Sequence, residues 1–143
     1  MITIIKYLMS LGLVFFALLV NGQNETTKTV DQMPQFPGCQ ETDQKSQKRC
    51  SHEKLMAFIQ NNLKYPKEVE GKEEGTVMVN FVVSSKGTIK DISIKRSLNK
   101  IFDNEGIRVV ELMNKKGIRW IPGKKDGKPI DVALSLPLKF KME

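Results

Sequence analysis

The chain has 143 residues, of which 40% are hydrophobic and 27% are charged, and its formal net charge is +7. This composition excludes collagen-like, coiled-coil and largely disordered chains, and it leaves room for one small globular domain with a modest core. The lysines and arginines are scattered along the chain and interleaved with Asp and Glu. We therefore expect a solvated basic surface and no nucleic-acid site.

The N-terminus has the pattern of a secretory signal peptide. Lys6 precedes an apolar run over residues 7–20, and Gly22 supplies a small residue for cleavage. The run is shorter than the roughly 20 apolar residues that a membrane-spanning helix needs. We predict that residues 1–22 are a signal peptide that is removed on export to the periplasm. The alternative is an uncleaved anchor in the inner membrane, because three isoleucines ahead of Lys6 extend the apolar stretch.

Export would bring the two cysteines, Cys39 and Cys50, into an oxidising compartment, where a matched pair usually forms a disulfide. Closing the short polar loop between them would stabilise the fold by about 3 kcal/mol on the chain-entropy model. Free thiols and a metal site are the alternatives, although a zinc site formed with His52 would lack one ligand. Residues 23–38 show no apolar period, so residues 23–50 are predicted to form a linker that carries the disulfide loop.

The folded domain is predicted to span residues 51–143. Ser51 is suited to cap a helix with one apolar face, and Pro66 ends that helix. Residues 76–83 then alternate along a strand that is apolar enough on both faces to be central in a sheet. The domain is therefore expected to open with a helix that leads into its central strand.

A second strand, a second helix and a last strand complete the predicted domain. The second strand covers residues 88–97, where the apolar phase slips near Asp91 and predicts a β-bulge. The second helix is predicted to start from an Asp103 cap and to end at Gly117, with one apolar stripe between them. The last strand covers residues 130–140 and alternates without interruption.

The predicted order of elements is therefore α, β, β, α, β. The second helix returns the chain along the sheet, and placing the third strand beside the first gives an antiparallel sheet with the strand order 2-1-3. Both helices then cover one face, so the predicted fold class is a two-layer α+β domain with a three-stranded antiparallel sheet. Trp120 is predicted to be buried between the second helix and the sheet.

The sequence offers no catalytic, metal or cofactor site. His52 is the only histidine, and it lacks the second histidine of a zinc-protease helix. No G-x-S-x-G turn presents a nucleophile, and the stretch GKKDGKP lacks the residue order of a phosphate-binding loop. We therefore expect a binding protein that is not an enzyme and uses no cofactor.

Several short motifs follow one another in the second part of the chain. They are Tyr65-Pro66, Gly75-x-Val77-x-Val79-x-Phe81, Gly87, Trp120-x-Pro122-Gly123, Gly127-x-Pro129 and Leu136-Pro137-x-x-Phe140. Their order and spacing resemble those of the TonB C-terminal domain, and Phe36-Pro37-Gly38 resembles a segment that often precedes that domain. The chain thus resembles the TonB C-terminal family in its Bacteroidetes-type form, although these residues also have roles in turns and core packing that need no shared function.

The resemblance implies a periplasmic binding module linked to TonB-dependent transmembrane transport. Such a module docks an extended peptide of an outer-membrane receptor by adding it as a strand to its own sheet. One alternative is a short N-terminally anchored energy transducer that couples to a proton-driven complex of the inner membrane. Another is an envelope structural protein that binds peptidoglycan through its basic surface.

The last strand is predicted to carry the partner site. Pro137 has no N–H to donate to a ladder, so this strand should lie at an edge of the sheet with its outer side open. The backbone groups predicted to face the partner are those of Asp131, Ala133, Ser135 and Pro137. Three nearby lysines favour an acidic peptide there: Lys128, Lys139 and Lys141. The alternative is that these charges only protect an exposed edge from aggregation.

Overall fold

A computed structural model of the protein describes residues 29–69 and 73–142. Its elements in chain order are α1 (Gln44–Asn62), β1 (Gly75–Val83), β2 (Ile89–Arg96), α2 (Lys100–Lys115), β3 (Gly123–Lys125), β4 (Lys128–Ile130) and β5 (Val132–Phe140). The predicted signal peptide, residues 1–22, lies outside the described residues. Within the described ranges, no helix has the length and apolar character needed to cross a membrane.

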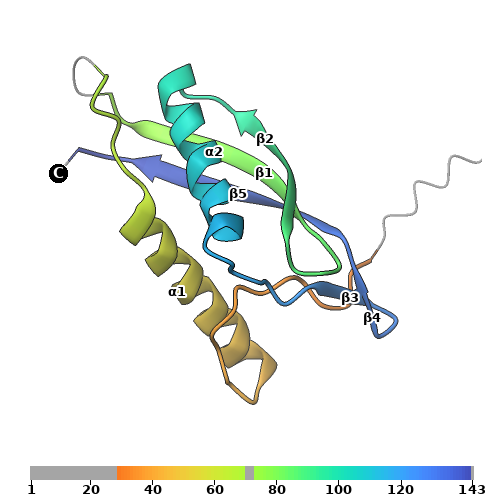
Figure 1. Ribbon diagram of the computed structural model, residues 1–143. Coiled ribbons are helices and arrows are strands. Elements are labelled where there is room, and N and C mark those ends of the chain that lie inside the picture. The colour runs from red at the N-terminus through yellow and green to blue at the C-terminus, as the bar shows by residue number, and fades with distance from the viewer. Residues whose placement is uncertain (1–28, 70–72, 143) are drawn as a thin grey trace, which may run out of the picture.

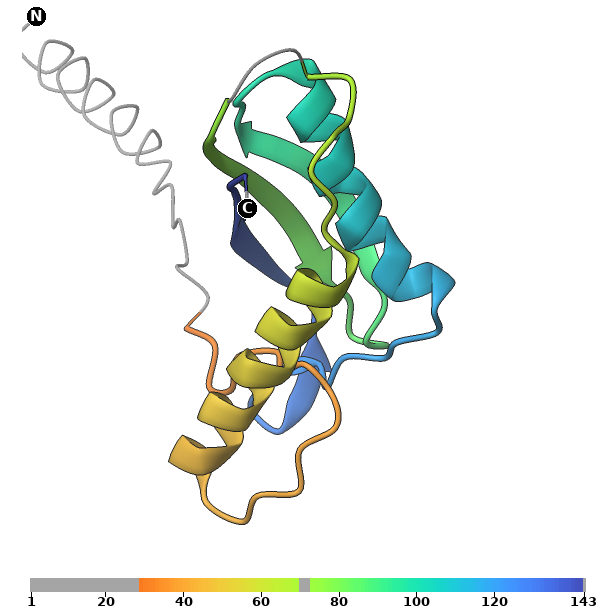
Figure 2. The same ribbon diagram turned by 90° about the vertical axis from the view of Figure 1, so that its left-hand side faces the viewer.

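The three long strands form one antiparallel sheet in the order β2-β1-β5, and both helices lie on one face of it (Figure 1, Figure 2). The predicted two-layer α+β fold with strand order 2-1-3 is therefore confirmed. The β-bulge predicted near Asp91 is also confirmed, because its φ is 51° and the β1–β2 register shifts beside it. The short strands β3 and β4 form a separate two-stranded hairpin.

The core fills the space between the sheet and the helices. The largest fully buried side chains come from β1, α2 and β5: Val77, Val79, Phe81, Val83, Phe102, Val109, Val110, Met113 and Leu138. Full burial of each such side chain stabilises the fold by about 1.5–3 kcal/mol. Gly106 lets α2 approach the sheet closely, because a Cβ there would lie 3.2 Å from the side chain of Val79.

Helix α1 begins at Gln44, so the prediction that it starts from a Ser51 cap is wrong. Asp43 caps the helix, and its carboxylate accepts hydrogen bonds from two backbone N–H groups of the first turn, each at 3.0 Å. These bonds satisfy donors that have no partner inside the helix. Ser51 lies within the helix instead, and its hydroxyl accepts a hydrogen bond from the backbone N–H of Phe36 at 2.7 Å.

The segment ahead of α1 packs on the domain, so the linker predicted over residues 23–50 is corrected for its described part. Gln32 forms an antiparallel bridge to Lys124 in β3, and Gln35 forms one to Ile121, just ahead of β3. The side chain of Phe36 is 7% exposed and belongs to the core, where its ring centroid lies 5.4 Å from that of Trp120. This segment is therefore a structural part of the folded unit.

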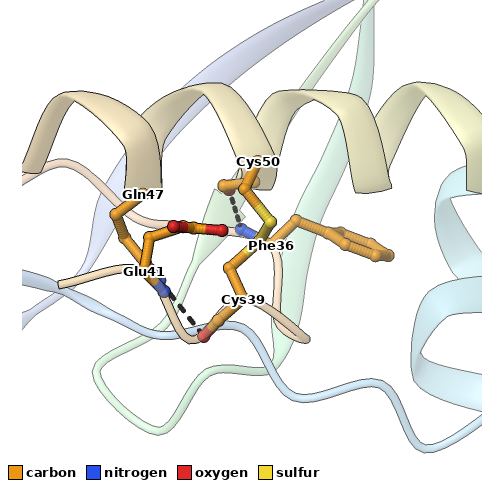
Figure 3. Close-up of a disulfide and its surroundings, with 6 residues drawn as sticks. Phe36, Cys39, Glu41, Gln47 and Cys50 are labelled. Atoms are coloured by element: carbon orange, nitrogen blue, oxygen red, sulfur yellow. Dashed lines mark hydrogen bonds between the residues drawn. A yellow bond between two sulfur atoms is a disulfide. The ribbon is translucent and has the colours of Figure 1, made fainter. Parts of the chain in front are cut away.

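The predicted disulfide between Cys39 and Cys50 is present and joins this segment to α1 (Figure 3). Because both sulfurs are in the bridge, neither serves as a free thiol or a zinc ligand. Gln47 holds the loop from inside: its side-chain oxygen accepts a hydrogen bond from the backbone N–H of Glu41 at 3.1 Å, and its Nε2 donates to the carbonyl of Cys39 at 3.5 Å. The loop is thus fixed by covalent and polar contacts.

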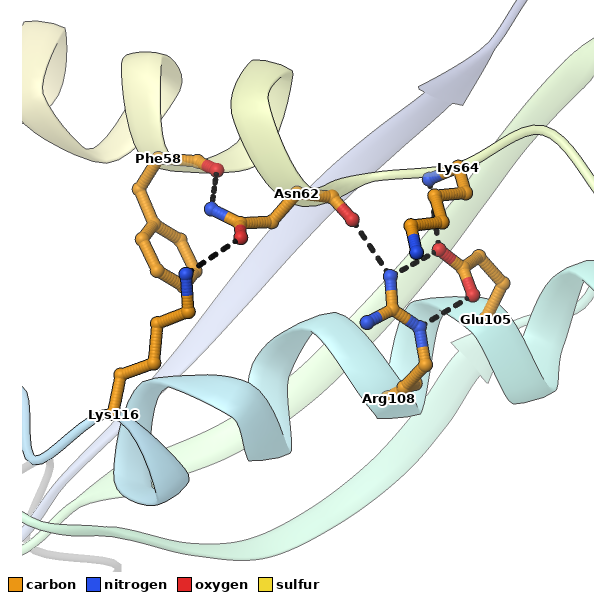
Figure 4. A network of polar contacts seen from close by, with 6 residues as sticks. All are labelled: Phe58, Asn62, Lys64, Glu105, Arg108 and Lys116. Atoms are coloured by element: carbon orange, nitrogen blue, oxygen red, sulfur yellow. Dashed lines mark hydrogen bonds and ion pairs between the residues drawn. The ribbon is translucent and has the colours of Figure 1, made fainter.

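A polar network joins the C-terminal end of α1 to α2 (Figure 4). Arg108 donates a hydrogen bond from Nη2 to the backbone carbonyl of Asn62 at 2.6 Å and pairs with Glu105 on its own helix. Lys116 donates from Nζ to the side-chain oxygen of Asn62 at 3.0 Å. The last carbonyls of a helix need partners from outside the helix, so this network fixes where α1 ends against α2.

The N-terminus of α2 differs from the prediction. Asn99 caps the helix, and its side-chain oxygen accepts hydrogen bonds from two N–H groups of the first turn at 3.0 and 3.1 Å. The prediction of an Asp103 cap is therefore wrong. Asp103 lies in the first turn and accepts a hydrogen bond from the backbone N–H of Leu98 at 3.1 Å, which holds the chain that enters the helix.

The β1–β2 turn rests on the backbone of Trp120. Gly87 has a φ of 80°, a conformation that favours glycine. Its carbonyl accepts a hydrogen bond from the Trp120 N–H at 2.9 Å, and a Cβ at Gly87 would lie only 2.2 Å from the Trp120 oxygen. Trp120 is 5% exposed and packs edge-on against Phe81 of β1 and Phe36. Its predicted burial is confirmed, but these aromatic partners come from β1 and from the segment ahead of α1, whereas the prediction named the second helix.

Replacement of both Cys39 and Cys50 by serine should lower the free energy of unfolding by about 3 kcal/mol, because the bridge restricts the unfolded chain and the loop is ordered in the fold. Urea denaturation of the variant and of the wild type measures the difference. The wild type with its disulfide reduced serves as the matched control and should resemble the variant. An unchanged free energy of unfolding would contradict the assignment of this loop to the folded unit.

Trp120→Ala should lower the free energy of unfolding by about 3–5 kcal/mol, because it removes a buried aromatic side chain that packs against Phe36 and Phe81. Arg119→Ala, at the exposed neighbouring position, is the control and should change the stability by less than about 0.5 kcal/mol. Equilibrium denaturation followed by circular dichroism compares the two variants. Similar small losses for both would place Trp120 outside the core.

Candidate functional site

Strand β5 forms an open edge of the sheet, because β1 is its only strand partner among the described residues. In the β1–β5 register, Pro137 lies opposite Met78. A proline has no N–H, so this pair is one of the non-hydrogen-bonded pairs of the antiparallel ladder. Ala133 and Ser135 are in phase with Pro137, so their backbone N–H and C=O groups point away from β1. We call the outward backbone groups of Ala133, Ser135 and Pro137 the β5 edge.

Asp131, the fourth residue predicted for the partner site, lies just ahead of β5, and its carboxylate is engaged within the fold. It accepts a hydrogen bond from the backbone N–H of Ser85 at 2.8 Å and forms an ion pair with Lys90. The hydrogen bond with Lys90 lowers the pKa of Asp131 and raises the pKa of Lys90. The side chain of Asp131 therefore ties the start of β5 to the β1–β2 hairpin.

A pocket of about 330 Å³ lies between α1 and β5, beside the β5 edge. Its lining includes residues 33–35 and the side chains of Lys48, His52, Leu55, Phe81, Trp120, Leu134 and Leu136. We call this cavity the α1–β5 pocket. Most of these side chains are apolar, so the pocket is suited to an apolar group that enters from the open side of β5.

The ionisable side chains of the α1–β5 pocket are basic. Lys48 and His52 are exposed on α1, and no acidic side chain of the described residues lines the cavity. Lys139 is also exposed on β5, but it is in phase with Ser135 and Pro137, so its side chain lies on the face of the sheet opposite the pocket. Lys48 and His52 are therefore the basic groups at the pocket that favour a ligand with negative charge.

A family model of the Gram-negative bacterial TonB protein C-terminal domain matches residues 61–142, which is more than half of the chain. The chain belongs to this family. The family is a periplasmic, non-enzymatic type of domain that in general binds receptors of the outer membrane. The matched range contains all five strands and α2, including the whole β5 edge.

Among solved structures, the solution structure of the Helicobacter pylori TonB C-terminal domain is similar to this chain. The sequence identity is 21%, the TM-score is 0.48, and the match covers 64% of this chain and 80% of that chain. Comparison with curated proteins finds no match.

The α1–β5 pocket is not predicted by the sequence, because a third of its lining residues belong to the segment that is predicted to be a linker: Met33, Pro34, Gln35 and Lys48. Two signals indicate that this segment is folded. Asp43 is a favoured cap residue followed by good helix formers, and Phe36 is a large aromatic residue within an otherwise polar stretch. The TonB match begins at residue 61, so most of α1 and the disulfide lie ahead of it.

Proposed function

We propose that this TonB-family protein is a periplasmic module that binds an extended peptide of an outer-membrane receptor and thereby takes part in TonB-dependent transport. The peptide adds to the sheet as a further strand along the β5 edge. The observation that supports this most directly is the register of Pro137, which leaves the backbone groups of Ala133 and Ser135 without a partner strand.

Strand addition suits this edge for a physical reason. Each outward N–H and C=O group of β5 exchanges a bond with water for a bond with the peptide, and a row of such bonds holds an extended chain in register. Pro137 has no N–H, so it shortens the row of outward donors on β5. The same gap discourages strand pairing between two copies of the protein. The exposed lysines at Lys128, Lys139 and Lys141 favour an acidic peptide through long-range attraction.

The proposal includes export, with residues 1–22 removed as a signal peptide. An intact mass of the mature protein that still contains these residues would favour the short anchored transducer instead. Binding to peptidoglycan would favour the envelope structural protein, and it should weaken steeply with salt because it depends on the basic surface alone. The open edge gives the peptide-binding module a specific structural basis that neither alternative requires.

Ala133→Pro should abolish binding of peptides from the plug segments of outer-membrane receptors while the domain stays folded, because only an outward N–H is lost. Isothermal titration with these peptides and circular dichroism measure the two effects. Ala133→Ser keeps the N–H and is the matched control. Ser135→Pro should act in the same way, although it also removes a hydrogen bond from the Ser135 hydroxyl to Asn80 at 2.6 Å.

Two outcomes would contradict this prediction in different ways. If Ala133→Pro unfolds the domain, the N–H of Ala133 faces β1 and the assigned phase of the strand is wrong. If the variant folds and binds the peptides as the wild type does, the binding site lies elsewhere on the domain.

A further inference from the structure

We propose that the α1–β5 pocket is a specificity pocket that receives one large apolar side chain of the added peptide, and that the basic residues beside it select an acidic residue two positions away. This inference rests on the proposed strand addition at the β5 edge. It goes beyond that function because it specifies the peptide sequence that this protein prefers.

The geometry of strand addition leads a side chain into the pocket. Side chains of a strand point alternately to the two faces of a sheet, and directly paired residues on neighbouring strands point to the same face. The helix-covered face of β5 carries Leu134 and Leu136, and both line the α1–β5 pocket. A peptide residue that pairs with either of them therefore points into the space between β5 and α1.

The lining of the pocket suits an apolar occupant. Leu55 from α1 and the aromatic side chains of Phe81 and Trp120 complete an apolar surface with Leu134 and Leu136. The volume of about 330 Å³ lies at the small end of ligand pockets, which span roughly 300–1,000 Å³. It has room for a side chain of leucine or phenylalanine size, and burial of such a side chain strengthens binding.

Charge complementarity defines the second part of the motif. Lys48 and His52 are four residues apart on α1, so they lie on one face of the helix, and both line the pocket. Peptide residues at alternate positions share the helix-covered face of the sheet. An acidic residue two positions from the apolar one is therefore on the side where these basic groups lie.

The pocket wall on α1 is held in place by features ahead of the TonB match. Cys50 lies between Lys48 and His52 in the helix, and its disulfide to Cys39 ties this turn to the segment that follows Phe36. Ser51 in the same turn accepts the hydrogen bond from Phe36. This wall lies outside the range 61–142 that matches the TonB family, whereas the β5 edge lies inside it. The selectivity is therefore a property of this chain, and the edge is common to the family.

The test uses the exported protein with its disulfide intact and three synthetic peptides of nine residues. The first peptide has a central leucine, an aspartate two residues to either side and threonine elsewhere, because threonine favours strands. The second replaces the leucine by alanine, and the third replaces both aspartates by lysine. The fluorescence of Trp120, the single tryptophan of the chain, reports binding because this residue lines the pocket.

We expect the leucine peptide to bind about tenfold more tightly than the alanine peptide, in line with the apolar area that the leucine buries. Leu55→Phe, which fills the pocket, should remove this preference. Lys48→Glu, a change at an exposed position that leaves the core intact, should weaken the aspartate peptide and strengthen the lysine peptide. Circular dichroism shows that each variant is folded.

Equal affinities of the leucine and alanine peptides for the wild type would overturn the pocket proposal. If Ala133→Pro still abolishes binding of both peptides in that case, the proposed strand addition stands without the pocket. If Ala133→Pro binds all three peptides as the wild type does, the proposed function itself is wrong. Unchanged peptide preferences in Lys48→Glu would overturn the charge selection alone.

Discussion

The central position of β1 is the constraint on which the rest of the structure depends. It pairs with β2 on one side and β5 on the other, and its helix-facing side chains Val77, Val79, Phe81 and Val83 are all buried. Because β1 already has a hydrogen-bonded strand on each side, β5 lies at the edge of the sheet. Its outer backbone groups have no partner strand among the described residues. Helix α1 lies beside α2 on the same face of the sheet (Figure 2) and forms a pocket with β5. The candidate site therefore follows from the central position of β1, which places β5 at the edge of the sheet.

The parts of the fold that have a local pattern could be predicted from the sequence. Alternation in β1 and β5 specified both strands, and Pro137 within the last strand indicated an edge because its missing N–H excludes a central position. The phase slip at Asp91 predicted the bulge. The cysteine count, together with the predicted export, predicted the pairing of Cys39 with Cys50. Each of these predictions depends on chemistry that is visible within a few residues.

The missed parts depend on contacts between distant residues. Gln35 pairs with Ile121, and neither residue belongs to a stretch of alternating apolar and polar residues that would predict a strand. Phe36 is buried because Trp120 supplies its partner, a contact that no local pattern contains. The pocket is formed by α1, this segment and β5 together, so a prediction in which the segment is a linker does not contain it. Asp43 and Ser51 are both favoured cap residues, and the local sequence alone does not decide between them.

Amide hydrogen exchange measured by NMR tests the central claim, that the β5 edge is open and accepts a strand. In the free protein, the N–H groups of Ala133 and Ser135 should exchange rapidly, while those of Leu134 and Leu136 should be protected by their bonds to β1. A saturating receptor plug peptide should protect Ala133 and Ser135 as well. Protection of these two amides in the free protein, or rapid exchange in the complex, would contradict the account.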